Sequence, residues 1–252
     1  MDQQFGSLGD NHDNLWEAKF MKAIFILIAT IIFAIVPFLS PDFGGFDPER
    51  FPIPQRNAAI QPAGWAFSIW ALIYLWLIAH AVFGVFKYRE DAEWDRGRVA
   101  LFISLSVGAT WLPVALLSPI WATVLIWIML SAALMAAYQS DRAAPAWIAR
   151  WPIALYAGWL SAASFVSIGL LLAGYGFFEE NTAAVIALVL ATGFAGYNAY
   201  RLRSLLYGAA AAWGLFAIGI SNLSSSMLLS IAPIVAAILV FGLSALNRIK
   251  QR

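Results

Sequence analysis

The sequence has 252 residues, of which 62% are hydrophobic and only 12% are charged, and its mean hydropathy is +0.77. Soluble domains carry about 25% charged residues, so this composition excludes a soluble globular protein. The net charge of +1 gives no indication of a nucleic-acid partner. The lack of cysteine in the sequence excludes disulfides and thiolate metal sites.

Charge-free stretches divide the chain into membrane-spanning segments. Each stretch can cross a hydrocarbon core of about 30 Å as a helix, which takes roughly 20 residues. Two of them can cross twice, because each has a break near its middle, at Leu117-Ser118-Pro119 and at Ser221-Asn222. The runs are apolar on all sides rather than alternating, which favours helices over a barrel. We therefore predict an all-α polytopic membrane helix bundle with about eight transmembrane helices, drawn from the charge-free stretches 23–41, 57–86, 99–140, 151–178, 181–200 and 204–247.

The polar regions before and after the first span differ in character. Residues 1–22 carry several acidic side chains, unlike the basic start of a cleaved signal peptide, so we expect this tail to be retained. Asn14-Leu15-Trp16-Glu17 fits a capping box, which predicts a short interfacial helix; an ordinary solvated lead-in is the alternative. The 42–63 loop contains four prolines and can be neither a helix nor a central strand.

Basic residues are distributed unevenly between the two sides of the predicted bundle. Of the 15 Lys and Arg residues, 13 lie in the tails and in the loops at 87–98, 141–150 and 201–203, and only Arg50 and Arg56 lie on the other side. The positive-inside rule then places both termini in the cytoplasm. We expect a multi-pass protein of a bacterial inner (cytoplasmic) membrane, in contact with membrane lipid.

The predicted spans offer little for catalysis. They contain no carboxylate, Lys, Arg or Cys, so we expect neither an enzyme nor a protein-held metal ion. His80 is their only ionisable residue, and it could bond a neighbouring helix or serve as a ligand to the metal of a tetrapyrrole. The second span carries aromatic residues on two faces, which would suit a large, flat ligand.

Tryptophan divides the chain into segments, because 11 of the 12 lie before residue 160. We interpret residues 1–22 as a cytoplasmic tail, 23–178 as a Trp-rich five-helix bundle and 179–252 as an Ala- and Gly-rich three-helix extension with the C-terminal tail. Small residues let helices approach closely in lipid. We therefore expect the extension to pack against the bundle or a partner and to contribute little to ligand recognition.

Two motifs resemble the tryptophan-rich sensory protein family (TspO and its mitochondrial benzodiazepine-receptor relatives). The segment from Pro62 to Tyr74, PAGWAFSIWALIY, is similar to the start of that family's second helix, and Tyr156-Ala157-Gly158-Trp159 is similar to a signature in its fifth. The chain departs from the pattern at Ile60, Ala63, Leu155 and Ser167, and in a shorter spacing between Phe67 and Trp70. The resemblance covers about residues 23–172, and the last three helices are additional to the five-helix fold.

This resemblance implies a non-enzymatic membrane protein that binds a tetrapyrrole or another flat apolar molecule, with a sensory, regulatory or pigment-trafficking role. Porphyrin, bacteriochlorophyll and carotenoid are the ligands it suggests, in a pocket beneath the first outer loop. The implied ligand-binding residues are Pro62, Ala63, Trp65, Phe67, Trp70, Tyr74, Tyr156 and Trp159.

Two other functions stay open at this point. The chain could be a structural accessory subunit of a larger membrane complex, such as a photosynthetic reaction centre–light-harvesting core, or it could form a homodimer. A transporter is a third alternative, although the sequence has no pair of matching repeats with interrupted helices.

Overall fold

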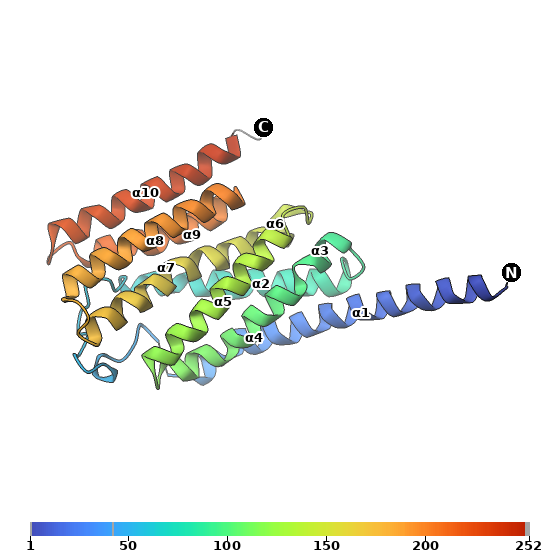
Figure 1. Ribbon diagram of the computed structural model, residues 1–252, viewed down its shortest axis with the longest axis horizontal. Coiled ribbons are helices and arrows are strands. Elements are labelled where there is room, and N and C mark those ends of the chain that lie inside the picture. The colour runs from blue at the N-terminus through green and yellow to red at the C-terminus, as the bar shows by residue number, and fades with distance from the viewer. Residues whose placement is uncertain (1, 42, 250–252) are drawn as a thin grey trace.

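The computed structural model describes residues 2–41 and 43–249, with side chains described over 18–41 and 43–247. These residues fold into an elongated helical bundle without strands in the part of the chain that is described (Figure 1). Its α-helices are α1 (Asp2–Ile35), α2 (Ile69–Phe86), α3 (Ala92–Arg96), α4 (Arg98–Ala115), α5 (Pro119–Gln139), α6 (Ala146–Ala149), α7 (Trp151–Gly174), α8 (Glu180–Leu202), α9 (Leu205–Ser221) and α10 (Met227–Ile249). Short 3-10 helices are η1 (Val36–Leu39), η2 (Pro48–Arg50) and η3 (Gly64–Ser68).

The predicted polytopic membrane bundle is confirmed. Over the described residues, 7 helices are long and apolar enough to cross a membrane, and α9 is a shorter apolar helix of 17 residues. At 1.5 Å per residue α9 is about 25 Å long, slightly less than the hydrocarbon core. It occupies the place of the seventh of the eight predicted spans.

Both predicted mid-stretch breaks separate two helices. α4 ends at Ala115 and α5 begins at Pro119, where the Ser118 hydroxyl accepts the backbone N–H of Trp121 at 3.4 Å as an N-cap. α9 ends at Ser221 and α10 begins at Met227. Because Ser and Pro start helices and Asn and Ser end them, these boundaries follow from local sequence.

The amino-terminal region differs from the expectation. α1 runs without a break from Asp2 to Ile35, so no separate interfacial helix precedes the first span. The capping-box residues 14–17 lie outside the described side chains. Because no proline interrupts residues 2–35, the helix of the first span continues into the tail, which extends beyond the bundle (Figure 1).

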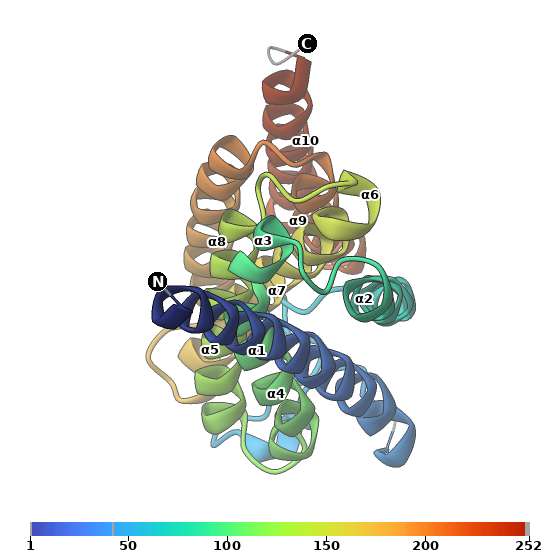
Figure 2. The same cartoon turned by 90° about the vertical axis from the view of Figure 1, so that its right-hand side faces the viewer.

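α7 lies at the centre of the bundle and packs against α2, α5, α6, α8 and α9 (Figure 2). Small residues on α7 allow this close approach. A Cβ on Gly158 would clash with the backbone carbonyl oxygen of Tyr207 on α9, and the hydroxyls of Ser161 and Tyr207 lie 2.8 Å apart. α10 packs on α8 and α9 at the edge. The extension therefore contacts the Trp-rich helices directly.

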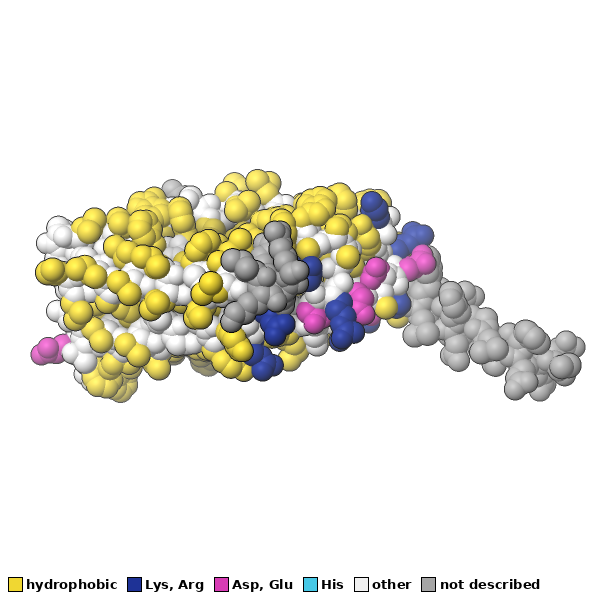
Figure 3. Space-filling view, turned by 90° about the horizontal axis from the view of Figure 1, so that it is seen from above, with side chains coloured by type: hydrophobic (Ala, Val, Ile, Leu, Met, Phe, Trp, Pro, Cys, Tyr) yellow, Lys and Arg dark blue, Asp and Glu magenta, His cyan; other side chains and the backbone are white. Residues whose placement is uncertain are grey.

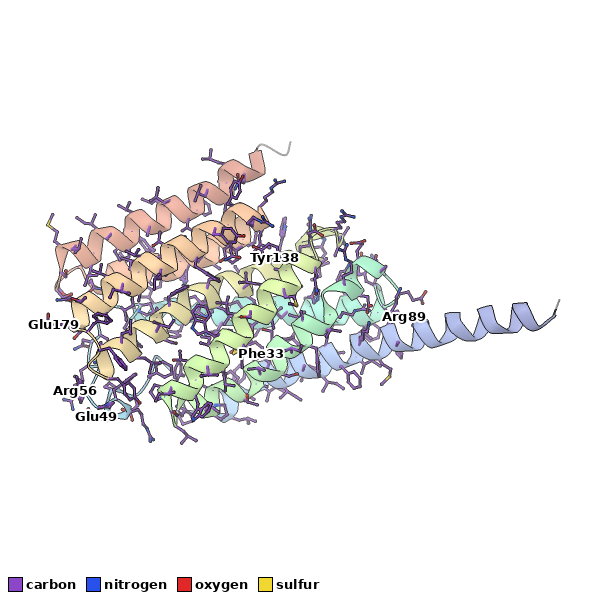
Figure 4. The ribbon with its side chains drawn as sticks, in the orientation of Figure 1. Phe33, Glu49, Arg56, Arg89, Tyr138 and Glu179 are labelled. Atoms are coloured by element: carbon purple, nitrogen blue, oxygen red, sulfur yellow. The ribbon has the colours of Figure 1, made fainter. Side chains whose placement is uncertain are left out.

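The surface of the bundle matches its membrane setting. On the face shown in Figure 3, hydrophobic side chains cover much of the length of the bundle, and most of the visible Lys, Arg, Asp and Glu lie towards one end. Leu75, for example, is 70% exposed on the side of α2. We call the end that carries residues 40–63 the loop end; the opposite end carries the 87–97 and 140–150 connections. Glu49, Arg56 and Glu179 lie at the loop end and Arg89 lies at the opposite end (Figure 4).

Candidate functional site

A small cavity lies inside the bundle at the loop end, and we call it the inner cavity. Its volume is about 50 Å³. Its walls come from the 43–62 loop, η3, α2, α4, α5, α7 and α9, and no described lining residue is Asp, Glu, Lys, Arg or His. The aromatic residues that line it are Phe43, Phe46, Phe67, Trp70, Trp111 and Trp159.

A second hollow, the side cavity, adjoins the inner cavity between α1, α2 and α4. Its volume is about 200 Å³, and it is lined by Phe33 and Pro37 of the α1–η1 segment and by Tyr74 of α2. Both cavities are lined by Phe43, Phe67, Trp70 and Trp111. These four side chains therefore lie between the two cavities, and we call them the partition.

The rings around the cavities contact one another edge to face. Trp70 lies 6.2 Å from Trp159 with its plane turned by 84°, and Phe67 lies 5.8 Å from Trp159 at 81°. Phe43 from the loop lies 5.2 Å from Trp111 at 79°. Edge-to-face pairs at these centroid distances are favourable beyond simple burial. The site is an aromatic cage assembled from four parts of the chain.

The loop reaches the cavity through two adjacent glycines. Gly45 has φ +136°, a conformation that L side chains rarely adopt, and a Cβ at this position would clash with the side-chain amide of Gln61. The Gln61 amide also donates to the Gly44 carbonyl oxygen at 3.0 Å. The Gly44-Gly45 pair therefore brings Phe43 and Phe46 over the inner cavity.

Trp159 supplies the most unusual polar group of the site. Its side chain is only 2% exposed, and its Nε1–H has no hydrogen-bond partner among the described residues. Buried indole N–H groups normally find an acceptor. Trp159 therefore combines a cavity-lining side chain with a buried donor that has no partner among the described residues.

The structure brings most of the sequence-predicted site residues to the two cavities. Pro62, Phe67, Trp70 and Trp159 line the inner cavity, and Tyr74 lines the side cavity. Tyr156 lies behind them, fully buried, with its ring 6.2 Å from Trp70 and its hydroxyl accepting from Ser104 Oγ at 3.1 Å.

The two other predicted residues of this segment lie elsewhere. Ala63 is not a lining residue, and its N–H donates to the carbonyl oxygen of Ala217 at 3.1 Å. Trp65 is 44% exposed and contacts Trp213 of α9 at 4.8 Å, so it faces the extension rather than a cavity.

His80 lies near the end of the bundle opposite the loop end, away from both cavities. Its Nδ1 lies 2.8 Å from the carbonyl oxygen of Ile148, and its ring stacks on Trp94 at 4.8 Å and 6°. Tyr88 covers the other side of this cluster, 4.5 Å from Trp94. These contacts join α2 to α3 and α6. His80 thus makes the bond to a neighbouring helix that was one of the two roles considered for it.

Several lining residues escaped the sequence reasoning. Phe43 and Phe46 sit beside the Gly44-Gly45 pair, which was the available signal for a close approach of the loop. Phe33 and Trp111 gave no signal beyond being aromatic in a span. Gly214 of α9 also lines the inner cavity, the one described lining residue that comes from the extension.

Comparisons with known proteins place this arrangement in a family. Searches of curated proteins and of solved structures return no match. The family model described as TSPO-like protein matches residues 21–246, a range that includes the long helices of the extension as well as the Trp-rich bundle. Because that match extends over most of the sequence, the chain belongs to the TSPO-like protein family.

Proposed function

We propose that this membrane protein binds a flat, largely apolar ligand of the tetrapyrrole type in the inner cavity. The observation that carries the proposal is the aromatic cage, in which the lining residue Trp159 has a buried Nε1–H without a partner among the described residues. Aromatic walls stack on planar rings, and one buried donor fixes the orientation of an otherwise apolar molecule. The charge-free lining supports binding rather than catalysis, and we propose a sensory, regulatory or trafficking role for that binding.

The size of the closed cavities sets a condition on this function. Small-molecule pockets usually measure about 300–1,000 Å³, whereas the inner cavity has about 50 Å³ and the side cavity about 200 Å³. A tetrapyrrole therefore enters only when the partition of Phe43, Phe67, Trp70 and Trp111 rearranges.

The lining residues also fit one mode of tetrapyrrole binding better than another. Trp70 and Trp159 offer ring faces and edges, but no imidazole, thiolate or carboxylate is among the described lining residues. His80 is engaged with Ile148 and Trp94 at the other end of the bundle. Recognition would therefore rest on stacking and on the Trp159 N–H, so a metal-free porphyrin is the suitable first ligand.

Titration with protoporphyrin IX tests the proposal. The porphyrin should quench the Trp fluorescence of the purified protein in nanodiscs with saturable binding. Trp70→Leu should weaken binding by about 1–3 kcal/mol, the range measured for planar rings stacked on aromatics. Trp121→Leu is the matched control, because Trp121 is 64% exposed on the side of α5. Equal affinity of the Trp70 variant and the control would reject this site.

We also propose that the loop end faces away from the cytoplasm of a bacterium. The described basic residues Lys19, Arg96 and Arg203 lie towards the other end, and Arg50 and Arg56 lie at the loop end. The positive-inside rule supports this orientation. Reporter fusions after residue 249 and within 48–50 should report opposite sides, and a common side would overturn the proposed topology.

The same purification also tests whether the protein belongs to a complex with other membrane proteins. A stoichiometric partner that survives nanodisc reconstitution, together with no saturable porphyrin binding, would favour a structural subunit instead.

A further inference from the structure

One wall of the inner cavity, residues 59–66, is hydrogen bonded to the extension through its backbone, while its Ile60 side chain packs near Gly169 of α7. We call residues 59–66 the wall segment. Its backbone groups have partners on α8, on α9 and at the end of α9. The hydrogen bonds are Ala59 N–H to Glu180 Oε1 at 2.8 Å, Asn222 Nδ2–H to Ala59 O at 2.7 Å, Ser221 Oγ–H to Gln61 O at 2.7 Å, Ala63 N–H to Ala217 O at 3.1 Å and Trp213 Nε1–H to Ala66 O at 2.9 Å.

The donors and acceptors from the extension are themselves held in place. Asn222 is 3% exposed, and its amide also donates to Ile218 O at 2.8 Å. The Trp213 ring packs edge to face on Trp65 at 4.8 Å. Backbone groups at a membrane end without secondary structure need such partners, since leaving them buried and unpaired is destabilising. Displacing the wall segment would therefore break several bonds at once.

The other loop element over the inner cavity is attached differently. We call residues 43–47 the flap. Its Phe43 and Phe46 rings contact Trp111 at 5.2 and 6.5 Å, and the Gly44 carbonyl accepts the Gln61 side-chain amide at 3.0 Å. Ring contacts of this kind reform in several geometries, whereas the bonds of the wall segment do not. The flap is therefore the more easily displaced of the two.

We infer that Trp213, Ser221 and Asn222 are positioning residues that keep the wall segment fixed, so that the cavity opens at the flap, with the Gln61–Gly44 bond as its latch. This inference rests on the proposed function, because an opening of the cavity matters only if the cavity binds a ligand. It assigns the extension the role of holding one wall of that cavity. The wall segment contributes Gln61 and Pro62 to the lining, and Phe67 follows it directly. Fixing residues 59–66 therefore fixes the frame on which the flap closes.

Amide hydrogen exchange of the protein without any ligand tests both the fixed wall segment and the more easily displaced flap. In the wild type, the flap amides should exchange at least tenfold faster than those of Ala59 and Ala63, which have partners on α8 and α9. Trp213→Phe keeps a ring against Trp65 but removes the bond to Ala66. It should raise exchange in the wall segment about fivefold or more, and Ser221→Ala should act in the same direction.

Matched variants separate this effect from a general loss of stability. Trp127→Phe deletes an indole N–H that has no partner among the described residues, and Ser131→Ala deletes a hydroxyl bonded within its own helix. Both controls should leave exchange in the wall segment unchanged. Gln61→Leu should raise exchange in the flap alone and should speed the release of protoporphyrin IX several-fold.

The outcomes decide the inference independently of the ligand. Unchanged exchange of the wall segment in both Trp213→Phe and Ser221→Ala would overturn it, as would exchange that rises equally in the two controls. If Trp213→Phe does not fold, Ser221→Ala decides alone. If protoporphyrin IX fails to bind the wild type, the proposed function falls, while the exchange data still support or reject the fixed wall and the latched flap.

Discussion

The indole N–H of Trp213 donates a 2.9 Å hydrogen bond to the carbonyl oxygen of Ala66, 147 residues earlier in the chain. Trp213 is the only tryptophan after residue 160 in the sequence. The indole N–H is the only hydrogen-bond donor of this side chain, and it is bonded to the residue that precedes Phe67, a lining residue of the inner cavity. The bond joins the extension to the candidate site and ties the position of α9 to the shape of the inner cavity.

Gly45 and Gly44 form a pair of neighbouring test positions in the flap. In Gly45→Ala the new methyl group would clash with the Gln61 side chain, and the backbone at residue 45 has φ +136°, which is strained for alanine. The substitution should therefore displace the flap and speed the release of protoporphyrin IX by about tenfold. Gly44→Ala meets nothing within 4 Å and should release the ligand at the wild-type rate. Stopped-flow fluorescence measures both rates, and equal rates would show that the flap does not control release.

Gly158 sets the contact between α7 and α9. Gly158→Ala would drive a methyl group into the Tyr207 carbonyl and against Ala210, so the unfolding free energy should fall by about 1–3 kcal/mol. Gly193→Ala on α8 meets nothing within 4 Å and should be neutral or slightly stabilising. Steric-trap or denaturant unfolding in bicelles measures the difference. A stability of Gly158→Ala as high as that of the control would contradict the close α7–α9 packing.

Arg98 fastens the end of the bundle opposite the loop end. Its guanidinium is 3% exposed and donates to the carbonyl oxygens of Gly84, Tyr88 and Arg89, besides an ion pair with Asp95 at 3.3 Å. Arg98→Met leaves those acceptors and the carboxylate without their partner. We expect a loss of about 2–4 kcal/mol in unfolding free energy.

The control for Arg98 is Arg96→Met, two residues away. Arg96 is exposed and forms an ion pair with Glu93 at 3.0 Å. Exposed pairs contribute about 0–1 kcal/mol, so this variant should unfold at nearly the wild-type denaturant concentration. Similar losses in the two variants would indicate that Arg98 is not the buried anchor described.

A substitution of His80 distinguishes a structural role from a role as a ligand to the metal of a tetrapyrrole. His80→Phe keeps a ring on Trp94 but loses the bond to the Ile148 carbonyl. We expect a stability loss of about 1 kcal/mol and an unchanged affinity for protoporphyrin IX and for haem. An absorption spectrum of bound haem that changes in this variant would instead assign His80 to the metal.

The sequence predicted the helices well because their boundaries depend on local signals. Ser118-Pro119 favours a helix start, because Ser caps helices and Pro is tolerated in the first turn, and Ser221-Asn222 favours a helix end. The tail was harder to predict, since a capping-box pattern at 14–17 permits a helix start without requiring one. α1 accordingly runs through that position to Asp2.

The site was predicted only in part, because the fold decides which aromatic residues face inward. Trp65 and Trp70 belong to the same motif, but residues 64–68 form a 3-10 turn, in which side chains advance by about 120° rather than 100° per residue. Trp65 accordingly faces α9 while Trp70 faces the cavities. Phe43 and Trp111 are brought together only by the path of the loop, which no residue spacing encodes.

Trp159→Phe tests the central claim most directly, because the substitution keeps a ring in the wall of the cavity and removes only the unpaired Nε1–H. The ligand-free variant should be at least as stable as the wild type, since the wild type leaves this donor without a partner. Its affinity for protoporphyrin IX should fall by about 0.5–1.5 kcal/mol, roughly two- to tenfold, because a neutral hydrogen bond to the ligand is lost. Trp127→Phe, which removes another unpaired indole donor outside both cavities, should bind as the wild type does. Equal affinity of all three proteins for the porphyrin would contradict the assignment of the inner cavity as the ligand site.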